Sequence, residues 1–104
     1  MQLDNYIFEA LRGSTKAHPQ DLVDVLYHVD GRMKLVMSLD ELAGGLLRLI
    51  EQGKIGESDR HRFYEITDGT PPKPFSGLTL DEYRQVCEAY QKWFWKRHKA
   101  LSKK

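Results

Sequence analysis

Three side chains capable of acid–base or metal chemistry share one edge of a predicted helix. Asp21, Asp24 and His28 follow one another at i, i+3 and i+7, a spacing that places them on the same side of a helix. Carboxylates and an imidazole in such a row are able to bind a divalent cation or to exchange protons. A solvated helix edge with a local Asp–His pair gives the same pattern far more often, so we predict a polar surface and no metal site.

The single cysteine, Cys87, is the other candidate for chemistry. It lies between Val86 and Tyr90 on the apolar face of a predicted helix, and no neighbouring signature supplies a base. We therefore expect a buried, unreactive thiol. The phosphate-binding, dinucleotide-binding, zinc-protease and nucleophile-elbow motifs are all absent from the sequence. The sequence predicts a protein without catalytic residues, cofactor, metal or small-molecule ligand.

The charge is distributed unevenly along the 104 residues, although the net charge is only +1. Residues 1–83 carry 9 basic and 14 acidic side chains, whereas residues 84–104 carry 7 basic and 1 acidic. The length predicts one small domain. A lone cysteine, together with the absence of any apolar run near the ~18 residues that span a bilayer, predicts a cytoplasmic protein with no membrane segment.

Helical spacing of apolar residues predicts the elements that position these side chains. The first helix covers residues 3–11 and stops at Gly13, and the second has Pro19 in its first turn and ends at Gly31. An apolar-alternating link over residues 32–37 is expected to follow.

The third and fourth helices each begin at a capping box, in which an N-cap Ser or Thr and a Glu three residues later bind each other's backbone amides. Ser38 and Glu41 form the first box, and Thr79 and Glu82 form the second. The third helix is expected to end at Gly53 in a left-handed conformation. Its predicted buried face consists of Leu39, Leu42, Ala43, Leu46, Leu47 and Ile50.

Two strand-like runs, KIGE and RFYEI, predict a β-hairpin around the charged tip at residues 58–61. The fourth helix is expected to run to about Leu101, a length of roughly 34 Å. Its apolar face is predicted to consist of Tyr83, Val86, Cys87, Tyr90, Trp93, Phe94 and Leu101.

The run DGRMKLVMSLDELAGGLLRLIEQGKIGESDRHRFYEI, within residues 3–66, resembles the last two-thirds of a winged helix-turn-helix domain. It is similar to short bacterial winged-helix proteins without an assigned function. The resemblance implies a mainly α fold with a small β-hairpin: a winged-helix-like domain over residues 1–66, with three helices and a wing. A Pro/Gly-rich connector over residues 67–78 and a helix with a basic tail over residues 79–104 would follow, the helix packing on its own domain or on a second copy.

Winged helices bind DNA, RNA and proteins, so the resemblance names no single function. In a DNA-binding member the third helix would lie in the major groove. The positions that would face the groove here are Asp40, Glu41, Gly44, Gly45, Arg48, Glu51 and Gln52. Only Arg48 is cationic, and the carboxylates repel phosphate. The hairpin residues Arg60, His61 and Arg62 are the other candidates for a phosphate or groove contact, unless they form an ordinary solvated tip.

Gly44 and Gly45 stand inside the third helix, where each costs roughly 1 kcal/mol relative to Ala. We expect another surface to approach closely there. The approaching surface is either the fourth helix or a partner protein. In the third alternative, the helix merely tolerates the two glycines and no surface approaches them.

Trp95 is displaced from the apolar face of the fourth helix and stands among Lys92, Lys96 and Lys99. It is a candidate exposed anchor for a partner. Phe8 is similarly displaced on the first helix, and a second copy whose Trp95 face covers Phe8 would bury both. The alternative explanation for these two displaced aromatic residues is a wider core. The simpler explanation of the basic end is that its cations complement the helix dipole and that the tail is solvated.

These observations predict a non-catalytic bacterial interaction protein that binds a protein partner, as immunity or antitoxin-like proteins do, or that self-associates as a dimer. The predicted interface consists of Asp40, Glu41, Gly44, Arg48, Phe8, Trp95, Lys92, Lys96 and Lys99. The alternative function is a DNA-binding, transcription-regulator-like protein using Arg48, Arg60, His61 and Arg62, with lysines of the fourth helix on phosphates. The acidic third helix disfavours that alternative.

Overall fold

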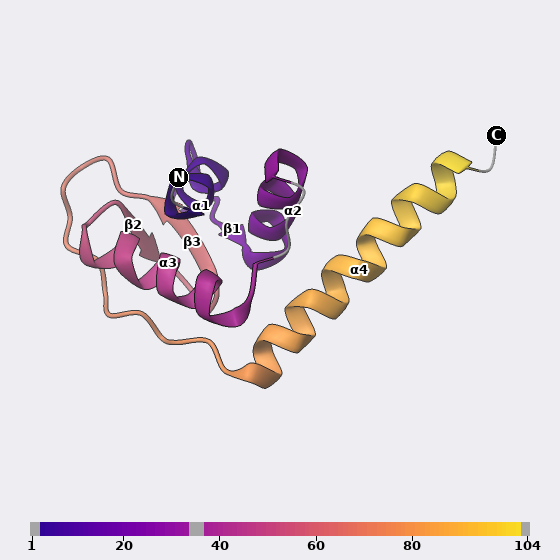
Figure 1. The fold of residues 1–104 in the computed structure, drawn as a ribbon. Helices are drawn as coiled ribbons and strands as arrows, with labels where there is room; N and C mark the ends of the chain where they lie inside the picture. The colour runs from indigo at the N-terminus through magenta and orange to yellow at the C-terminus, as the bar shows by residue number, and fades with distance from the viewer. Residues whose placement is uncertain (1–2, 34–36, 103–104) are drawn as a thin grey trace.

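The fold is mainly helical with a small antiparallel sheet and a long C-terminal helix, as the sequence predicts. The computed structural model describes residues 3–33 and 37–102, except for the side chains of residues 32, 33 and 97–102. The elements, shown in Figure 1, are α1 (Leu3–Leu11), β1 (Gln20–Asp21), α2 (Leu22–Met33), α3 (Leu39–Glu51), β2 (Ile55–Glu57), β3 (Arg62–Glu65) and α4 (Leu80–Ser102).

The predicted hairpin is present, but it belongs to a three-stranded sheet in the order β1-β3-β2. Gln20 pairs with Phe63 and Ile55 with Glu65, both in antiparallel register. The expectation that Pro19 lies in the first turn of a helix was wrong, because β1 completes the open edge of β3. Helix α2 begins two residues after β1 starts, with the Asp21 carboxylate accepting from the Asp24 amide at 2.9 Å.

Helix α2 continues past Gly31, where an end was predicted, to Met33. No neighbouring atom lies within 4 Å of the position that a Cβ on Gly31 would take. Packing therefore neither requires a glycine at this position nor disfavours one. Residues 32 and 33, the start of the expected link, are therefore helical, and residues 34–36 lie outside the described part of the chain. Met37, which follows, is fully buried.

Helix α3 has the predicted capping box and the predicted left-handed end. The Ser38 amide donates to the Glu41 carboxylate at 2.9 Å, the Glu41 amide donates to the Ser38 hydroxyl at 3.2 Å, and Gly53 has φ +72°. The buried face differs in part from the prediction, because Leu49 is buried and Leu47 is 42% exposed. The helix is rotated so that its inner face meets α1.

Gly45 marks the point where α1 crosses α3. A Cβ on Gly45 would lie 2.5 Å from Ile7 Cδ1 and 3.2 Å from Asp4 Oδ1, so any larger residue would require the Ile7 side chain to move. The close approach predicted for this glycine pair is internal, but α1 makes it and not α4. The core, to which all four helices and the sheet contribute, consists of Ile7, Leu11, Leu22, Val25, Leu26, Val29, Met37, Leu42, Leu46, Leu49, Ile50, Ile55, Phe63 and Tyr90.

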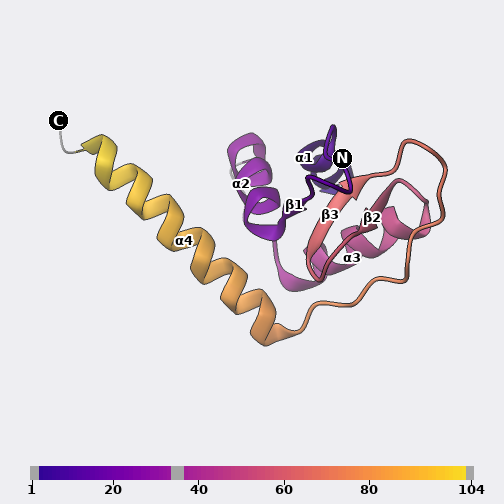
Figure 2. The same ribbon diagram turned by 180° about the vertical axis from the view of Figure 1, so that it is seen from behind.

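Helix α4 starts against the body and ends away from it. The predicted capping box holds its first turn, with the Thr79 amide donating to Glu82 at 2.9 Å and the Glu82 amide to the Thr79 hydroxyl at 3.1 Å. Figures 1 and 2 show the C-terminal end pointing away from the other elements, and the molecule measures 48 × 28 × 27 Å. We call residues 80–90 the inner segment and residues 91–102 the outer segment.

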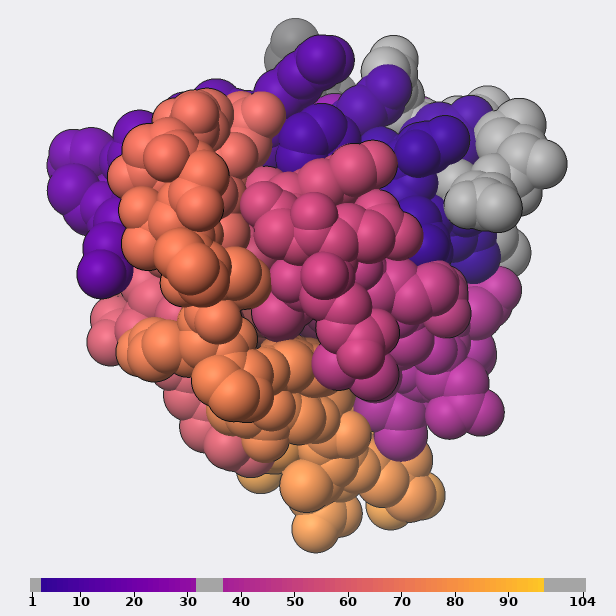
Figure 3. Space-filling view, turned by 90° about the vertical axis from the view of Figure 1, so that its left-hand side faces the viewer, coloured from indigo at the N-terminus to yellow at the C-terminus, as the bar shows by residue number. Residues whose placement is uncertain are grey.

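The connector over residues 67–78 runs along the surface beside α3 and leads into α4, as the space-filling view shows (Figure 3). Phe75 and Leu78 of this connector pack against the core cluster. None of the described helices is both long and apolar enough to cross a membrane.

Candidate functional site

The exposed face of α3 is acidic, and its one predicted cation is already bound within the molecule. Asp40, Glu41 and Glu51 are exposed. Arg48 Nε donates to Asp4 Oδ2 at 2.7 Å and Arg48 Nη2 donates to Asp4 Oδ1 at 2.8 Å, a bidentate pair between α3 and α1. This hydrogen bonding holds the pKa of Asp4 below its ordinary value. The Arg48 guanidinium also covers Gly44, where a Cβ would lie 3.1 Å from Nη1.

The hairpin tip is not a free solvated turn, because it holds the start of α4. Arg60 Nε donates to Glu82 Oε2 at 2.7 Å. His61 Nε2 lies 2.9 Å from the Gly77 carbonyl oxygen and 3.8 Å from Glu82 Oε1. The Thr79 amide, with the Arg60 guanidinium second, lowers the pKa of Glu82 to about 2. Three hairpin residues were predicted to contact phosphate. Among them, Arg62 is exposed and takes part in none of the ion pairs observed in the described residues.

Glu57, which the sequence analysis did not single out, joins the hairpin to the connector. It is buried on β2, and its carboxylate accepts from the His61 amide at 2.8 Å, the Ser76 amide at 2.9 Å and the Ser76 hydroxyl at 2.6 Å. His61 has φ +64°, a left-handed conformation that the Glu57 contact helps to hold. We call Glu57, Arg60, His61 and Glu82 the hairpin clasp. The only sequence signal for this cluster was the position of the Glu57 carboxylate within a three-residue strand.

The inner segment of α4 is bound to its own domain by two tyrosine hydroxyls. Tyr83 donates to the Met37 carbonyl oxygen, and Tyr90 donates to the Asp30 carboxylate. Burial raises the pKa of both phenols, with neighbouring charges adding to the effect, and brings that of Tyr83 to about 12. Both hydroxyls therefore stay protonated as donors across the physiological range.

The outer segment presents aromatic and basic side chains to solvent. Trp95 is 69% exposed, as predicted, and meets only the edge of Phe94 at a ring-centroid distance of 6.5 Å among the ring contacts observed. Lys92 and Lys96 are also exposed. The side chain of Lys99, the fourth predicted member of this surface, lies outside the described part of the structure.

Other large apolar side chains are exposed on or beside α4. Trp93 packs edge-to-face on Tyr27 of α2 at 4.7 Å, and both rings are partly open to solvent. Leu80, in the first turn of α4, is 50% exposed. Neither Leu80 nor Tyr27 was predicted as part of an interface, because a single apolar residue in a helix start or among polar neighbours carries no periodic signal.

Phe8 lies apart from this surface and is not an exposed anchor. Its side chain is half-buried against the core cluster, and the Lys54 ammonium lies 5.8 Å from the ring centroid. Phe8 therefore agrees with the alternative prediction, that this side chain belongs to a wider core.

Of the candidate residues for chemistry, Asp21 and Asp24 lie together, and burial and then the Asp21 charge raise the pKa of Asp24, whereas His28 faces another helix. Asp21 caps α2 through the Asp24 amide, and His28 Nε2 lies 3.9 Å from Glu9 Oε2 on α1. No group of His, Cys, Asp or Glu within the described residues is arranged to hold a metal ion. Cys87 is free and only half-buried, so the expected burial of its thiol was wrong.

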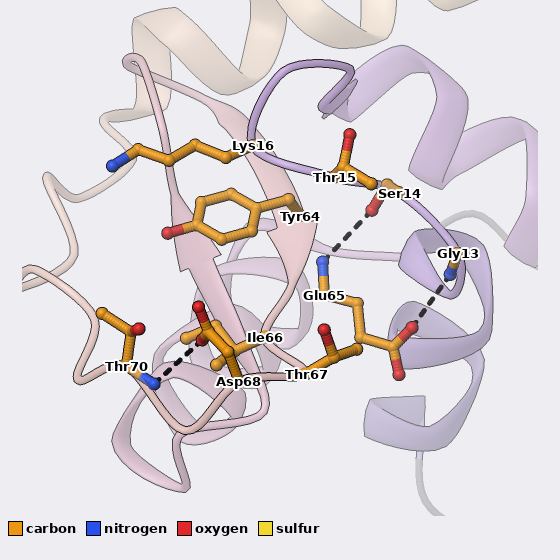
Figure 4. A pocket seen from close by; sticks show the side chains of 10 residues that line it. All are labelled: Gly13, Ser14, Thr15, Lys16, Tyr64, Glu65, Ile66, Thr67, Asp68 and Thr70. Carbon is orange, nitrogen blue, oxygen red and sulfur yellow. Dashed lines mark hydrogen bonds between the residues drawn. The ribbon is translucent and has the colours of Figure 1, made fainter.

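A pocket of about 290 Å³ lies between the α1–β1 loop and the end of β3 (Figure 4). Its polar groups largely bind one another. The Glu65 carboxylate accepts from the Gly13 amide at 3.0 Å, the Glu65 amide donates to the Ser14 hydroxyl at 3.2 Å, and the Asp68 carboxylate accepts from the Thr70 amide at 3.0 Å. The pocket holds no nucleophile–base pair among the residues that line it.

Comparison of the chain with protein-family models, with curated proteins and with solved structures gave no match in any of the three.

Proposed function

We propose that this chain is a non-catalytic interaction protein that binds a protein partner through the outer segment of α4 and the acidic start of α3. The observation that carries the proposal is Trp95, which is 69% exposed between Lys92 and Lys96 on a helix that leaves the body. Trp is among the residue types most enriched at binding hot spots.

The proposal includes a winged-helix body and a cytoplasmic location. Three helices followed by a hairpin support the winged-helix resemblance, and the free thiol of Cys87 is compatible with a reducing compartment. An immunity- or antitoxin-like role is the form of this function that best suits a small chain with an acidic body and a basic, aromatic helix.

Site-specific photocrosslinking in cells tests this function. A photoreactive phenylalanine analogue replaces Trp95 in one variant and Lys16, an exposed residue beside the pocket of Figure 4, in the matched control. We expect protein adducts at position 95 and not at position 16, because only the former lies on the proposed interface. Equal labelling at both positions, or no adduct with protein at position 95, would contradict the proposal.

Two ion pairs count against the DNA-binding alternative. Arg48 is held by Asp4 and Arg60 by Glu82, so two of the four predicted DNA contacts already have carboxylate partners. The His61 ring contacts the connector at Gly77, so Arg62 is the one that remains of the four predicted DNA contacts. Breaking either ion pair to bind phosphate would expose a carboxylate beside the DNA backbone.

Titration with duplex DNA at low salt tests this alternative. We expect no binding at micromolar protein concentration, because a protein with several phosphate contacts binds in or below that range and loses affinity steeply with salt. Salt-sensitive micromolar binding that weakens in both Arg62→Ala and Lys96→Ala, and not in the control Lys16→Ala, would establish the alternative and overturn the protein-partner proposal.

A further inference from the structure

The pocket of Figure 4 contains an aromatic ring that the sheet holds in place. Tyr64 of β3 stands directly opposite Gly56 of β2 in the antiparallel pairing. A Cβ on Gly56 would lie 2.8 Å from the Tyr64 hydroxyl oxygen and 2.9 Å from Cζ, so the ring lies against the glycine backbone. The ring is half-buried and lines the pocket, so the part that does not rest on Gly56 is accessible to a ligand.

Groups of opposite charge flank this ring. Figure 4 shows the Tyr64 side chain between those of Lys16 and Asp68, which come from the α1–β1 loop and from the segment after β3. The Thr70 amide donates to the Asp68 carboxylate at 3.0 Å and lowers its pKa, so the carboxylate is ionised at neutral pH. The pocket therefore offers an ammonium donor and a carboxylate acceptor on either side of an aromatic surface.

Several hydrogen-bonding groups of the pocket have no partner in the described part of the protein. The Tyr64 and Thr67 hydroxyls and the Lys16 ammonium make no hydrogen bond or ion pair there. The Thr15 hydroxyl oxygen accepts from the His18 amide at 3.1 Å, and its proton stays available for donation. These groups line one concavity of about 290 Å³, which is at the lower end of the range for small-molecule sites.

We propose that this pocket binds a neutral, polyhydroxylated ring compound of the size of one monosaccharide. The C–H groups on one face of such a ring pack on Tyr64, and its hydroxyl groups bind Lys16, Asp68 and Thr67. An apolar contact surface with a few placed polar groups is the usual composition of a small-molecule site. The inference goes beyond the proposed function and uses none of the residues of the proposed protein interface.

The charges of the pocket favour a neutral ligand over an ion. An anion attracted by Lys16 would meet the carboxylates of Glu65 and Asp68, which line the same pocket. A cation attracted by those carboxylates would meet the Lys16 ammonium. A hydroxyl group both donates and accepts, so one polyol can bind the ammonium and a carboxylate together, each through a charge-assisted hydrogen bond.

Titration of the full, isotope-labelled chain with monosaccharides, followed by two-dimensional amide NMR, tests the site. The probes are glucose, galactose, mannose and N-acetylglucosamine. We expect at least one of them to shift the amide signals of residues 13–16 and 64–70, which surround the pocket. The Kd should be about 1–10 mM, because one stacked ring and a few hydrogen bonds provide a modest binding free energy.

Substitutions at and beneath the ring test its role. Tyr64→Ala removes the stacking surface and should raise the Kd by about tenfold or more, whereas Tyr64→Phe keeps that surface and should change the Kd by less than about threefold. Gly56→Ala places a methyl group where the ring lies and should weaken binding by about threefold or more, because the ring must move. Tyr27→Ala, which removes a half-exposed tyrosine of α2 outside the pocket, is the matched control and should leave the Kd unchanged.

Two exposed residues test the polar contacts without altering the core. Lys16→Met and Asp68→Asn should each raise the Kd by about fivefold or more, because each removes a charge-assisted hydrogen bond to the ligand. Asparagine at position 68 still offers an oxygen to the Thr70 amide, so the loop is expected to keep its conformation. If Tyr64→Ala does not fold, as judged by circular dichroism, these two variants decide the question.

The outcomes that contradict the inference are distinct from those that contradict the proposed function. Absence of shifts at residues 13–16 and 64–70 with all of the sugars at about 50 mM would overturn it. Equal shifts in the wild type and in Asp68→Asn and Lys16→Met would also overturn it, as would binding of glucose-6-phosphate without any neutral sugar. None of these results affects crosslinking at position 95. A chain that binds a sugar and gives no protein adduct at position 95 would keep this inference and lose the proposed function.

Discussion

The two segments of α4 differ in what their side chains contact, although they form one continuous helix. In the inner segment, Tyr83 and Tyr90 donate to the domain and Glu82 pairs with Arg60 of the hairpin. In the outer segment, Trp93 still packs on Tyr27 of α2 and Phe94 on the core cluster, whereas Trp95 and Lys96 face solvent. A helix that is anchored at one end and exposed at the other keeps its direction fixed relative to the body, which is what a protruding binding element requires.

The cations of the two regions differ in the same way. Arg48 and Arg60 each bind a carboxylate of another element, and the Asp4 carboxylate that receives Arg48 is largely buried. On the outer segment, Lys92 lies 3.6 Å from Glu88 with both side chains widely exposed, a pair of the kind that contributes little to stability. The arginines of the body thus stabilise the fold, whereas the lysines of α4 remain accessible to a partner.

Truncation of Tyr90 should have the largest effect on stability. Its ring is buried against the core and its hydroxyl binds Asp30, so Tyr90→Ala should lower the free energy of unfolding by about 3–5 kcal/mol, as for other buried aromatic truncations. Urea-induced unfolding followed by far-UV circular dichroism measures the change.

Trp95→Ala is the matched control for this prediction, as it removes a larger aromatic from the outer segment. Measured at concentrations where the chain is monomeric, it should change the free energy of unfolding by less than about 0.5 kcal/mol. Similar losses in the two variants would mean that the inner and outer segments do not differ in docking as we describe.

Most of the elements are predictable from the sequence, because local signals specify them. Both capping boxes, the left-handed Gly53 and the hairpin depend on residues within a few positions of one another. The misjudged positions depend on distant partners. Strand β1 exists only because β3 offers an edge to Gln20, and the rotation of α3 that buries Leu49 and exposes Leu47 is set by its crossing with α1.

The exposed residues of the candidate site could be predicted from the sequence, whereas the residues that bind a distant segment of the chain could not. Trp95 stands apart from the apolar stripe of its own helix, and helical geometry alone is enough to place it in solvent. Arg60 and His61 have the composition of any charged turn. Their partners, Glu82 and Gly77, come from a segment sixteen or more residues away, and no local pattern indicates that pairing.

The pH dependence of stability should show the smaller contribution of the hairpin clasp. The folded protein lowers the pKa of Glu82 from 4.5 to about 2, chiefly through the Thr79 amide and then through Arg60. A carboxyl group with a lowered pKa stabilises the fold where it is ionised in both states, above its unfolded pKa. That stabilisation decreases as the pH falls below 4.5 and is lost by about pH 2.

Glu82→Gln should therefore be less stable than the wild-type chain at neutral pH, and the difference should shrink as the pH falls through this window. Other carboxyl groups with lowered pKa values, Asp4 and Asp68, titrate in both proteins and cancel in the difference. Glu88→Gln, which alters a widely exposed glutamate 3.6 Å from Lys92, is the control and should follow the wild-type curve. Parallel curves for Glu82→Gln and the wild type at all pH values would show that the clasp does not fix the start of α4, and the contrast between its two segments would then depend on the tyrosines alone.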